Sequence, residues 1–124
     1  MKAAKAIAKM GPKYLIIKKG EHGALLFAED KIFFAPALPL EVVFDPTGAG
    51  DTFAGGVMGL IAKTGDASYE NMKRGIIYGS AMASMCVEKF GPNRLLEISG
   101  DDLEARVQKF VDLVDFDAAS LKTA

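Results

Sequence analysis

The sequence contains one cysteine, one histidine and no tryptophan, and it has no excess of charge of either sign. The lone cysteine, Cys86, has no partner for an internal disulfide, which indicates a reducing, cytoplasmic compartment. Lysine and arginine number 15 against 16 aspartates and glutamates, so the charge favours neither nucleic acid nor an anionic membrane as a partner. No apolar run approaches the roughly 18 residues of a membrane span, and residues 1–10 lack the long apolar core of a signal peptide. We therefore expect a cytoplasmic protein without a nucleic-acid or membrane partner.

Apolar residues, by contrast, are plentiful. They make up 50% of the 124 residues, and the length alone fits one compact domain of roughly 100–150 residues. Short apolar runs predict strands at 14–17, 24–27, 32–34 and 41–44, and helical spacing predicts helices at 2–10, 51–63, 68–90 and 101–114. Ser68 is expected to cap the third of these helices, and Ser99 with Asp102 the last. This order of elements indicates an α/β fold.

The glycine-rich stretch DPTGAGDTFAGG at 45–56 lies between a predicted strand and a predicted helix. Glycine lets the backbone turn sharply, and the free N–H groups and positive dipole end of a helix start suit a phosphate. Two known nucleotide motifs do not fit. The Gly-Lys-Ser/Thr triplet of a P-loop is absent, and Phe53 stands at the third glycine position of the dinucleotide fingerprint, so an oxidoreductase is a weak hypothesis.

Asp51 falls in the first turn of the predicted helix and has two interpretations. A carboxylate beside a phosphate site repels the phosphate, but a general base that deprotonates an attacking hydroxyl needs this position. Alternatively, Asp51 only complements the helix dipole. The spacing alone does not separate the two.

The stretch at 45–56 closely resembles the second signature of the ribokinase-like (PfkB) carbohydrate and nucleoside kinases. The similarity extends back through KKGEHGA at 18–24 and forward through the small-residue helix at 78–84, and it covers roughly residues 10–112. The resemblance implies a three-layer α/β/α fold and transfer of the γ-phosphate of ATP to a hydroxyl group.

The resemblance also implies roles for individual residues. Asp51 matches the catalytic base, and the anion hole that stabilises the moving phosphoryl group matches Gly48, Ala49 and Gly50. The nucleotide-binding positions match Lys18, Gly20, Glu21, Gly23 and Ser80. Ser80 stands where many members have Asn or His near the adenine, which weakens that expected contact. From the residues alone, Lys18 and Lys19 are as well explained as surface charges as by phosphate contacts.

A monovalent-cation site, such as one for K⁺, is implied at Asp45, Thr47 and Gly91, with backbone carbonyls of Cys86 and Lys89 among its ligands. Magnesium is expected with ATP, although the acidic motif that helps to organise Mg²⁺ in the family lies outside this chain.

The similarity covers only the last two-fifths of such a kinase. We therefore expect residues 1–114 to be the C-terminal portion of a ribokinase-like domain, followed by a tail at 115–124, and the isolated chain to be inactive. An unpaired sheet edge would then contact either a second copy, giving a homodimer, or the missing N-terminal half. The expected activity is ATP-dependent phosphorylation of a sugar. The alternatives are a nucleoside kinase of the same family and, in another class, a non-catalytic nucleotide-binding fragment.

Overall fold

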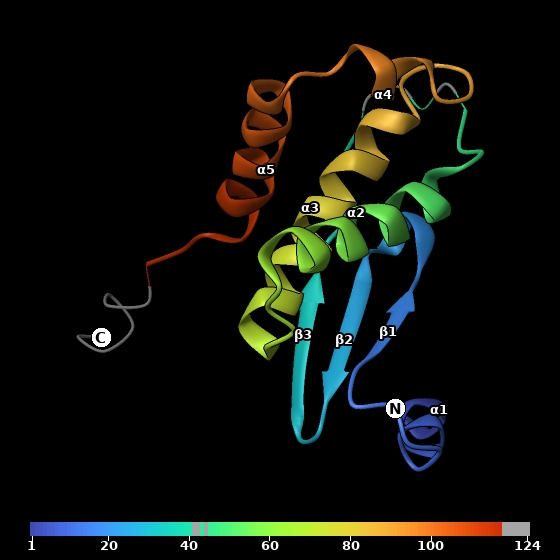
Figure 1. Ribbon diagram of the computed structural model, residues 1–124, viewed down its shortest axis with the longest axis vertical. Helices are drawn as coiled ribbons and strands as arrows, with labels where there is room; N and C mark the ends of the chain where they lie inside the picture. The colour runs from blue at the N-terminus through green and yellow to red at the C-terminus, as the bar shows by residue number, and fades with distance from the viewer. Residues whose placement is uncertain (41–42, 44, 118–124) are drawn as a thin grey trace.

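The computed structural model describes residues 1–40, 43 and 45–117 (Figure 1). The elements are α1 (Lys2–Ala8), β1 (Leu15–Lys18), the 3₁₀ turn η1 (Gly20–His22), β2 (Ala24–Ala28), β3 (Lys31–Ala35), α2 (Ala49–Thr64), α3 (Tyr69–Cys86), α4 (Asn93–Glu97) and α5 (Gly100–Val114). The three strands form one antiparallel sheet in the order β1–β2–β3. The α/β class is as predicted. No helix within the described ranges has the length and apolar character needed to cross a membrane.

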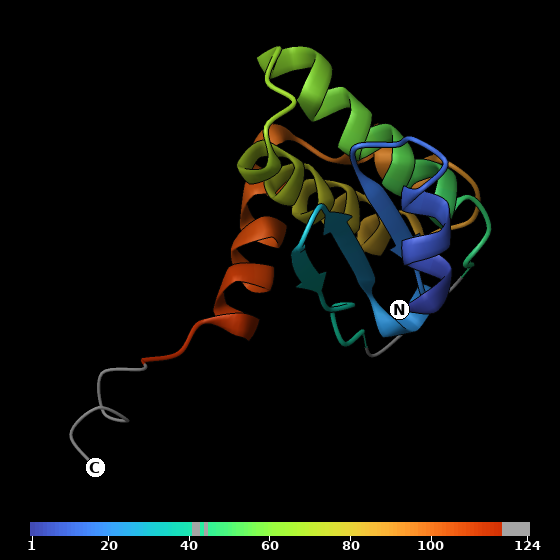
Figure 2. The ribbon, with the colours of Figure 1, turned by 90° about the horizontal axis from the view of Figure 1, so that it is seen from below.

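Helices α2 and α3 lie on the same side of the sheet (Figures 1 and 2). Alternation along β2 turns Ala24, Leu26 and Ala28 toward the interior, as expected for strand geometry. The core that joins this face to the two helices consists of Ala24, Leu26, Ala35, Phe53, Val57, Met72 and Ile76. On the opposite face of β3, Ile32 and Phe34 are 50% and 52% exposed, so this side of the sheet keeps a large apolar surface.

Two glycines allow α2 and α3 to cross closely. A Cβ atom on Gly56 would lie 2.7 Å from the Cα of Gly79, and one on Gly79 would lie 2.5 Å from the carbonyl oxygen of Phe53. Neither position accepts a larger residue without moving a helix backbone. The glycine in the small-residue part of α3 therefore serves close contact with the backbone of α2.

Both predicted serine caps are confirmed. Ser68 Oγ accepts the N–H of Asn71 at 3.2 Å, and Ser99 and Asp102 form a reciprocal capping box at the start of α5. Cys86 is a buried free thiol.

Other boundaries differ from the prediction. Helix α3 ends at Cys86 rather than near residue 90, and α4 was not predicted. The strand expected at 41–44 lies outside the described residues, apart from Val43, which belongs to no helix or strand.

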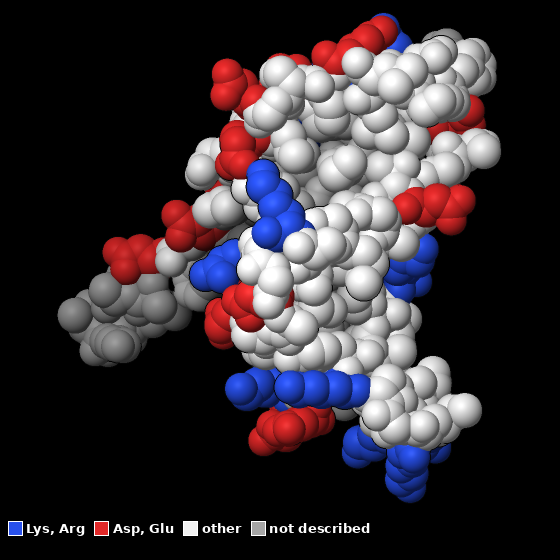
Figure 3. Space-filling model, viewed as in Figure 1, with Lys and Arg blue, Asp and Glu red and all other residues white. Residues whose placement is uncertain are grey.

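Charge of neither sign gathers into one broad patch on the described surface that Figure 3 shows. Basic and acidic side chains are interspersed there among uncharged residues. This distribution agrees with the nearly balanced composition of the chain.

Candidate active site

The glycine turn, defined here as residues 46–50, leads directly into α2. Gly48 has a left-handed backbone with φ of +83° and stands at the N-cap of α2. A Cβ atom at Gly48 would meet nothing within 4 Å, so the backbone angle and not lack of space accounts for glycine there. The carbonyl of Gly48 accepts the N–H of Thr52 at 2.9 Å and so begins the helix.

The three N–H groups of the predicted anion hole differ in availability. The N–H of Ala49 donates to the carbonyl of Pro46 at 3.2 Å, which closes the turn. The N–H groups of Gly48 and Gly50 make no hydrogen bond with any residue that the structure describes. Unsatisfied N–H groups at the positive end of a helix are able to bind an anion. The turn therefore offers Gly48 and Gly50 to a ligand, while Ala49 shapes the turn.

Asp51 is the third residue of α2 and is exposed. Its carboxylate has no hydrogen bond or ion pair with the described part of the chain. It is thus an uncommitted carboxylate on the same helical turn as the free N–H of Gly50. This geometry is compatible with a general base and also with a charge that complements the helix dipole.

Lys18, at the end of β1, reaches the glycine turn. Its Nζ donates to the carbonyl of Gly50 at 3.3 Å and lies 5.8 Å from the centre of the Phe53 ring. The sequence did not decide whether Lys18 and Lys19 are surface charges or phosphate contacts. Of the two, Lys18 is the one that lies beside the predicted anion hole. The spacing in the sequence gave no indication of this contact, because 32 residues separate Lys18 from Gly50.

The remaining predicted nucleotide positions lie around η1 and in α3. Gly20 and Gly23 have positive φ values of 56° and 88°, and a Cβ atom on Gly23 would collide with the carbonyl oxygen of Ala35. Both glycines thus shape the turn between β1 and β2. Glu21 is exposed, and its Oε1 lies 3.5 Å from Nε2 of His22. Ser80 is half-buried and follows Gly79 at the crossing of α2 and α3. Neither side chain has a hydrogen bond to the described residues of the glycine turn.

Asp45, Thr47 and Gly91, predicted to form a cation site, come together. Asp45 Oδ1 accepts the N–H of Thr47 at 3.0 Å, while the N–H of Asp45 donates to the carbonyl of Val87 at 3.1 Å. The pKa of Asp45 is held below its ordinary value, first by the N–H of Thr47, then by the Thr47 hydroxyl, and also by the N–H of Gly91.

The atoms that this group could offer to a cation are oxygens. One carboxylate with neighbouring carbonyls is an all-oxygen donor set, as hard cations prefer. The carbonyl of Gly91 is only weakly engaged, by the thiol of Cys86 at 4.0 Å. Within the described ranges, no three His, Cys, Asp or Glu residues cluster as they would around a metal ion.

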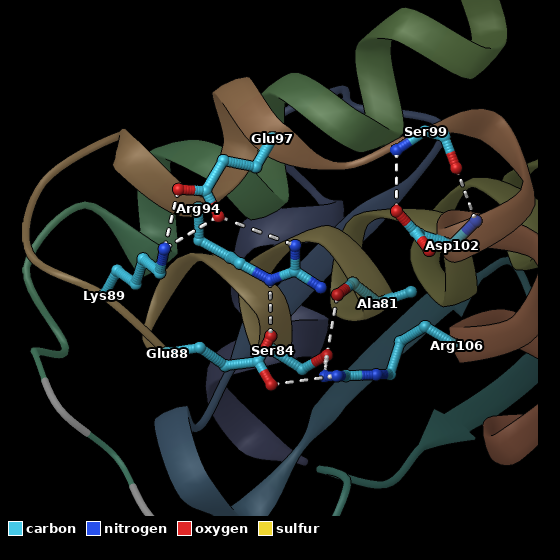
Figure 4. A network of polar contacts seen from close by, with 9 residues as sticks. All are labelled: Ala81, Ser84, Glu88, Lys89, Arg94, Glu97, Ser99, Asp102 and Arg106. Carbon is cyan, nitrogen blue, oxygen red and sulfur yellow. Dashed lines mark hydrogen bonds and ion pairs between the residues drawn. The ribbon is translucent and has the colours of Figure 1, made fainter.

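A second polar network, which the sequence did not predict, lies next to this group (Figure 4). Glu88 accepts from Arg94 Nε at 3.2 Å and from Arg106 Nη2 at 3.0 Å, and Arg106 Nη1 donates to Ser84 Oγ at 2.9 Å. Burial alone raises the pKa of Glu88, but the hydrogen bonds and charges of Arg106 and Arg94 outweigh burial and hold the pKa below its ordinary value. The sequence contained one indication of this network. Arg106 lies on the same face of its helix as the apolar Phe110, and a charged side chain on a buried face needs a partner.

Comparisons with known proteins agree on one family. The family model described as pfkB family carbohydrate kinase matches residues 1–98. A nucleoside kinase of Methanocaldococcus jannaschii is 38% identical over 77 residues, which are 62% of this chain and 24% of that protein. A ribokinase of Arabidopsis thaliana is 34% identical over 84 residues, which are 67% of this chain and 21% of that protein.

A solved structure shares the fold. Aminoimidazole riboside kinase from Salmonella enterica, complexed with aminoimidazole riboside and an ATP analog, matches with a TM-score of 0.74 and 29% identity. The match covers 86% of this chain and 35% of that one. The chain thus spans about a quarter of the length of the curated relatives and about a third of the solved kinase. Since the family model covers most of the chain and the solved kinase shares its architecture, the chain belongs to the PfkB family of carbohydrate kinases and has part of their ribokinase-like fold.

Proposed function

We propose that this chain forms the C-terminal portion of a cytoplasmic kinase that transfers the γ-phosphate of ATP to a hydroxyl group of a sugar. The observation that carries the proposal is the start of α2. There, the free N–H groups of Gly48 and Gly50, the uncommitted carboxylate of Asp51 and the ammonium of Lys18 lie around one turn. Phosphoryl transfer needs such a site, because its catalysis consists of positioning and charge stabilisation.

Asp51 takes the proton of the acceptor hydroxyl as the oxygen attacks phosphorus. The N–H groups of Gly48 and Gly50 hold the phosphoryl oxygens, and Ala49 keeps the turn closed through its bond to Pro46. Lys18 adds a positive charge at the same place. The anion hole in this proposal therefore uses two N–H groups, and not those of all three consecutive residues that the family resemblance implied.

The nucleotide lies, in this proposal, along the turn of Gly20, Glu21 and Gly23 and reaches toward Ser80. Mg²⁺ bound with ATP would neutralise phosphate charge, and residues outside this chain would hold it in part. Asp45, Thr47 and Gly91 would hold a monovalent cation such as K⁺, which would supply positive charge beside the glycine turn.

The acceptor is a sugar or a nucleoside. The relatives include both a nucleoside kinase and a ribokinase, so a nucleoside kinase is the second candidate. A phosphotransfer assay of the longer kinase with ribose, fructose and adenosine as acceptors separates these two.

The apolar outer face of the sheet supports the idea that further polypeptide covers it. Ile32 and Phe34 are half exposed there, and Phe34 is paired with Leu25 across the strands. A face of this kind is costly to leave in water. We infer that the N-terminal half of the kinase, or a second copy of the chain, packs against it.

The experiment that tests the proposed activity is the change Asp51→Asn in the longer kinase. Turnover should fall by about 10²–10⁴-fold, the usual scale for a lost general base, with little change in ADP affinity. Asp101→Asn is the matched control, because Asp101 is also an exposed aspartate in the first turn of a helix. If Asp51 only complements the helix dipole, both variants will keep near-normal turnover, and the proposal is wrong. If the wild-type kinase binds ADP but transfers no phosphate to any acceptor, the non-catalytic alternative is favoured.

A further inference from the structure

Asp45, the residue before the glycine turn, is hydrogen-bonded to the chain just past the end of α3. If α3 continued past Cys86, the carbonyl of Val87 would accept the N–H of Gly91, four residues later. Instead, the carbonyl of Val87 accepts the N–H of Asp45 at 3.1 Å, and the N–H of Gly91 faces the carboxylate of Asp45. The end of α3 therefore fixes the first residue before the glycine turn.

One peptide unit joins this contact to Glu88. The carbonyl of Val87 and the N–H of Glu88 belong to the same planar peptide, and that N–H donates to the carbonyl of Met85 at 3.1 Å. Any rotation of this peptide moves the hydrogen bond to Asp45. The side chain of Glu88 adds a restraint on such a rotation to the one that the hydrogen bond to Met85 provides.

Both carboxylate oxygens of Glu88 are engaged by different helices. Oε1 accepts from Arg94 Nε of α4 at 3.2 Å, and Oε2 accepts from Arg106 Nη2 of α5 at 3.0 Å. The side chains of Arg106, Arg94 and Glu88 are only 11%, 25% and 31% exposed, so solvent screens these pairs weakly. Arg106 is itself fixed by Ser84 Oγ, which donates to the carbonyl of Ala81 at 2.6 Å. The carboxylate is thus held from both sides (Figure 4).

We propose that Glu88 is a positioning residue for the glycine turn: clamped between Arg94 and Arg106, it fixes the Val87–Glu88 peptide, which in turn fixes Asp45 and the backbone that leads to Gly48. Arg94 and Arg106 act through Glu88 and do not contact a ligand. The helices α4 and α5 thereby contribute to the geometry of a site that neither of them touches.

The simplest competing explanation is that Glu88 only fastens α4 and α5 to α3. Tyr78 provides a matched control, because its hydroxyl donates to Glu104 Oε1 at 2.6 Å and also joins α3 to α5. Tyr78→Phe removes that link without touching residues 84–91. This variant shows how far the loss of one link between α3 and α5 alone changes the glycine turn.

The test compares Glu88→Gln with Tyr78→Phe in the ¹⁵N-labelled 124-residue chain. Glu88→Gln should shift the amide resonances of Asp45, Gly48 and Gly50, whereas Tyr78→Phe should leave all three in place. Arg94→Gln, which removes only one side of the clamp, should shift the same resonances in the same direction by less, and it decides the question if Glu88→Gln does not fold. Unmoved resonances of Gly48 and Gly50 in the Glu88 and Arg94 variants would overturn the proposal.

A second measurement rests on the proposed function. In the longer kinase, Glu88→Gln should lower kcat by about 10- to 100-fold, the scale of a small misplacement of reacting groups, and should change the KM for ATP less. Tyr78→Phe should leave kcat within about twofold of wild type, since surface or peripheral changes rarely alter a distant site. A normal kcat in Glu88→Gln would contradict the positioning role. The amide resonances report the geometry even if phosphotransfer itself proves wrong, so the two proposals fail separately.

Discussion

Lys18 Nζ donates a hydrogen bond to the carbonyl oxygen of Gly50 at 3.3 Å, so the end of β1 places a positive charge at the first turn of α2. The N-terminal end of a helix is itself positive, and a cation there is unfavourable by roughly 0.3–1 kcal/mol. The Phe53 ring, whose centre lies 5.8 Å from Nζ, offsets part of this repulsion. A bound phosphate would attract both the lysine and the helix end. The arrangement is therefore better suited to an occupied anion site than to an empty one.

Replacing Lys18 with methionine should weaken ADP binding by the chain about 10- to 100-fold, since a hydrogen bond to a charged group contributes roughly 1.5–3 kcal/mol. The free energy of unfolding should stay the same or rise slightly, because the repulsion from the helix end is removed. Isothermal titration measures the affinity, and the loss should shrink at high salt.

Lys19→Met is the control for charge alone. Lys19 is the adjacent lysine, it is exposed, and its side chain has no ion pair or hydrogen bond with the described residues. An equal loss of ADP affinity in the two variants would mean that net charge, and not the position of Lys18, attracts the nucleotide.

The crossing of α2 and α3 gives a prediction about stability. A Cβ atom on Gly79 would lie 2.5 Å from the carbonyl oxygen of Phe53 and 3.0 Å from Val57 Cγ2. Gly79→Ala must therefore push the helices apart, and overpacking of this kind costs about 1–3 kcal/mol. Gly59→Ala should instead stabilise the chain by about 0.5–1 kcal/mol, because Gly59 is a helical glycine with nothing within 4 Å of its Cβ position. Urea unfolding of both variants measures the difference, and a Gly79→Ala variant as stable as wild type would show that the helices do not need this close approach.

The helices and caps were largely predictable, because they depend on local sequence. Apolar residues at steps of three and four residues mark α2 and α3, and the serine before each of α3 and α5 supplies a cap whose partners lie within three residues. The position of Gly48 at a left-handed turn is also local, since only its own backbone angle requires glycine.

The end of α3 was not predictable for a physical reason. Phe90 continues the apolar spacing of that helix, so the local pattern favours a longer helix. Just past the end of the helix, the carbonyl of Val87 accepts the N–H of Asp45 instead of a later helical N–H, and this bond joins residues far apart in the chain. The same limit applies to Arg106, whose partners Ser84 and Glu88 lie 22 and 18 residues away. Sequence spacing indicates that a buried charge needs a partner but does not identify that partner.

The capping box of α5 leads to a prediction about pH. The carboxylate of Asp102 accepts the N–H of Ser99 at 2.9 Å, and Ser99 Oγ accepts the N–H of Asp102 at 3.1 Å. The N–H of Ser99, and next its hydroxyl, hold the pKa of Asp102 below its ordinary value of 3.8. Because this pKa is lower in the folded chain than in the unfolded one, the charged carboxylate stabilises the fold above pH 3.8, and the stabilisation is lost as the pH falls from there through the folded pKa.

Asp102→Asn should therefore lower the free energy of unfolding at neutral pH, and its difference from wild type should shrink as the pH falls below 3.8. Urea unfolding from neutral to acidic pH measures that difference. Asp45 and Asp66 also have lowered pKa values, but they titrate in both proteins, so the comparison isolates Asp102. Asp101→Asn, in the same helical turn but without a hydrogen bond to the cap, should show a smaller effect at every pH. Acidification removes the charge of Asp102 but not its side chain. If the difference in free energy of unfolding between wild type and Asp102→Asn stays constant into the acidic range, the charge of Asp102 does not stabilise α5.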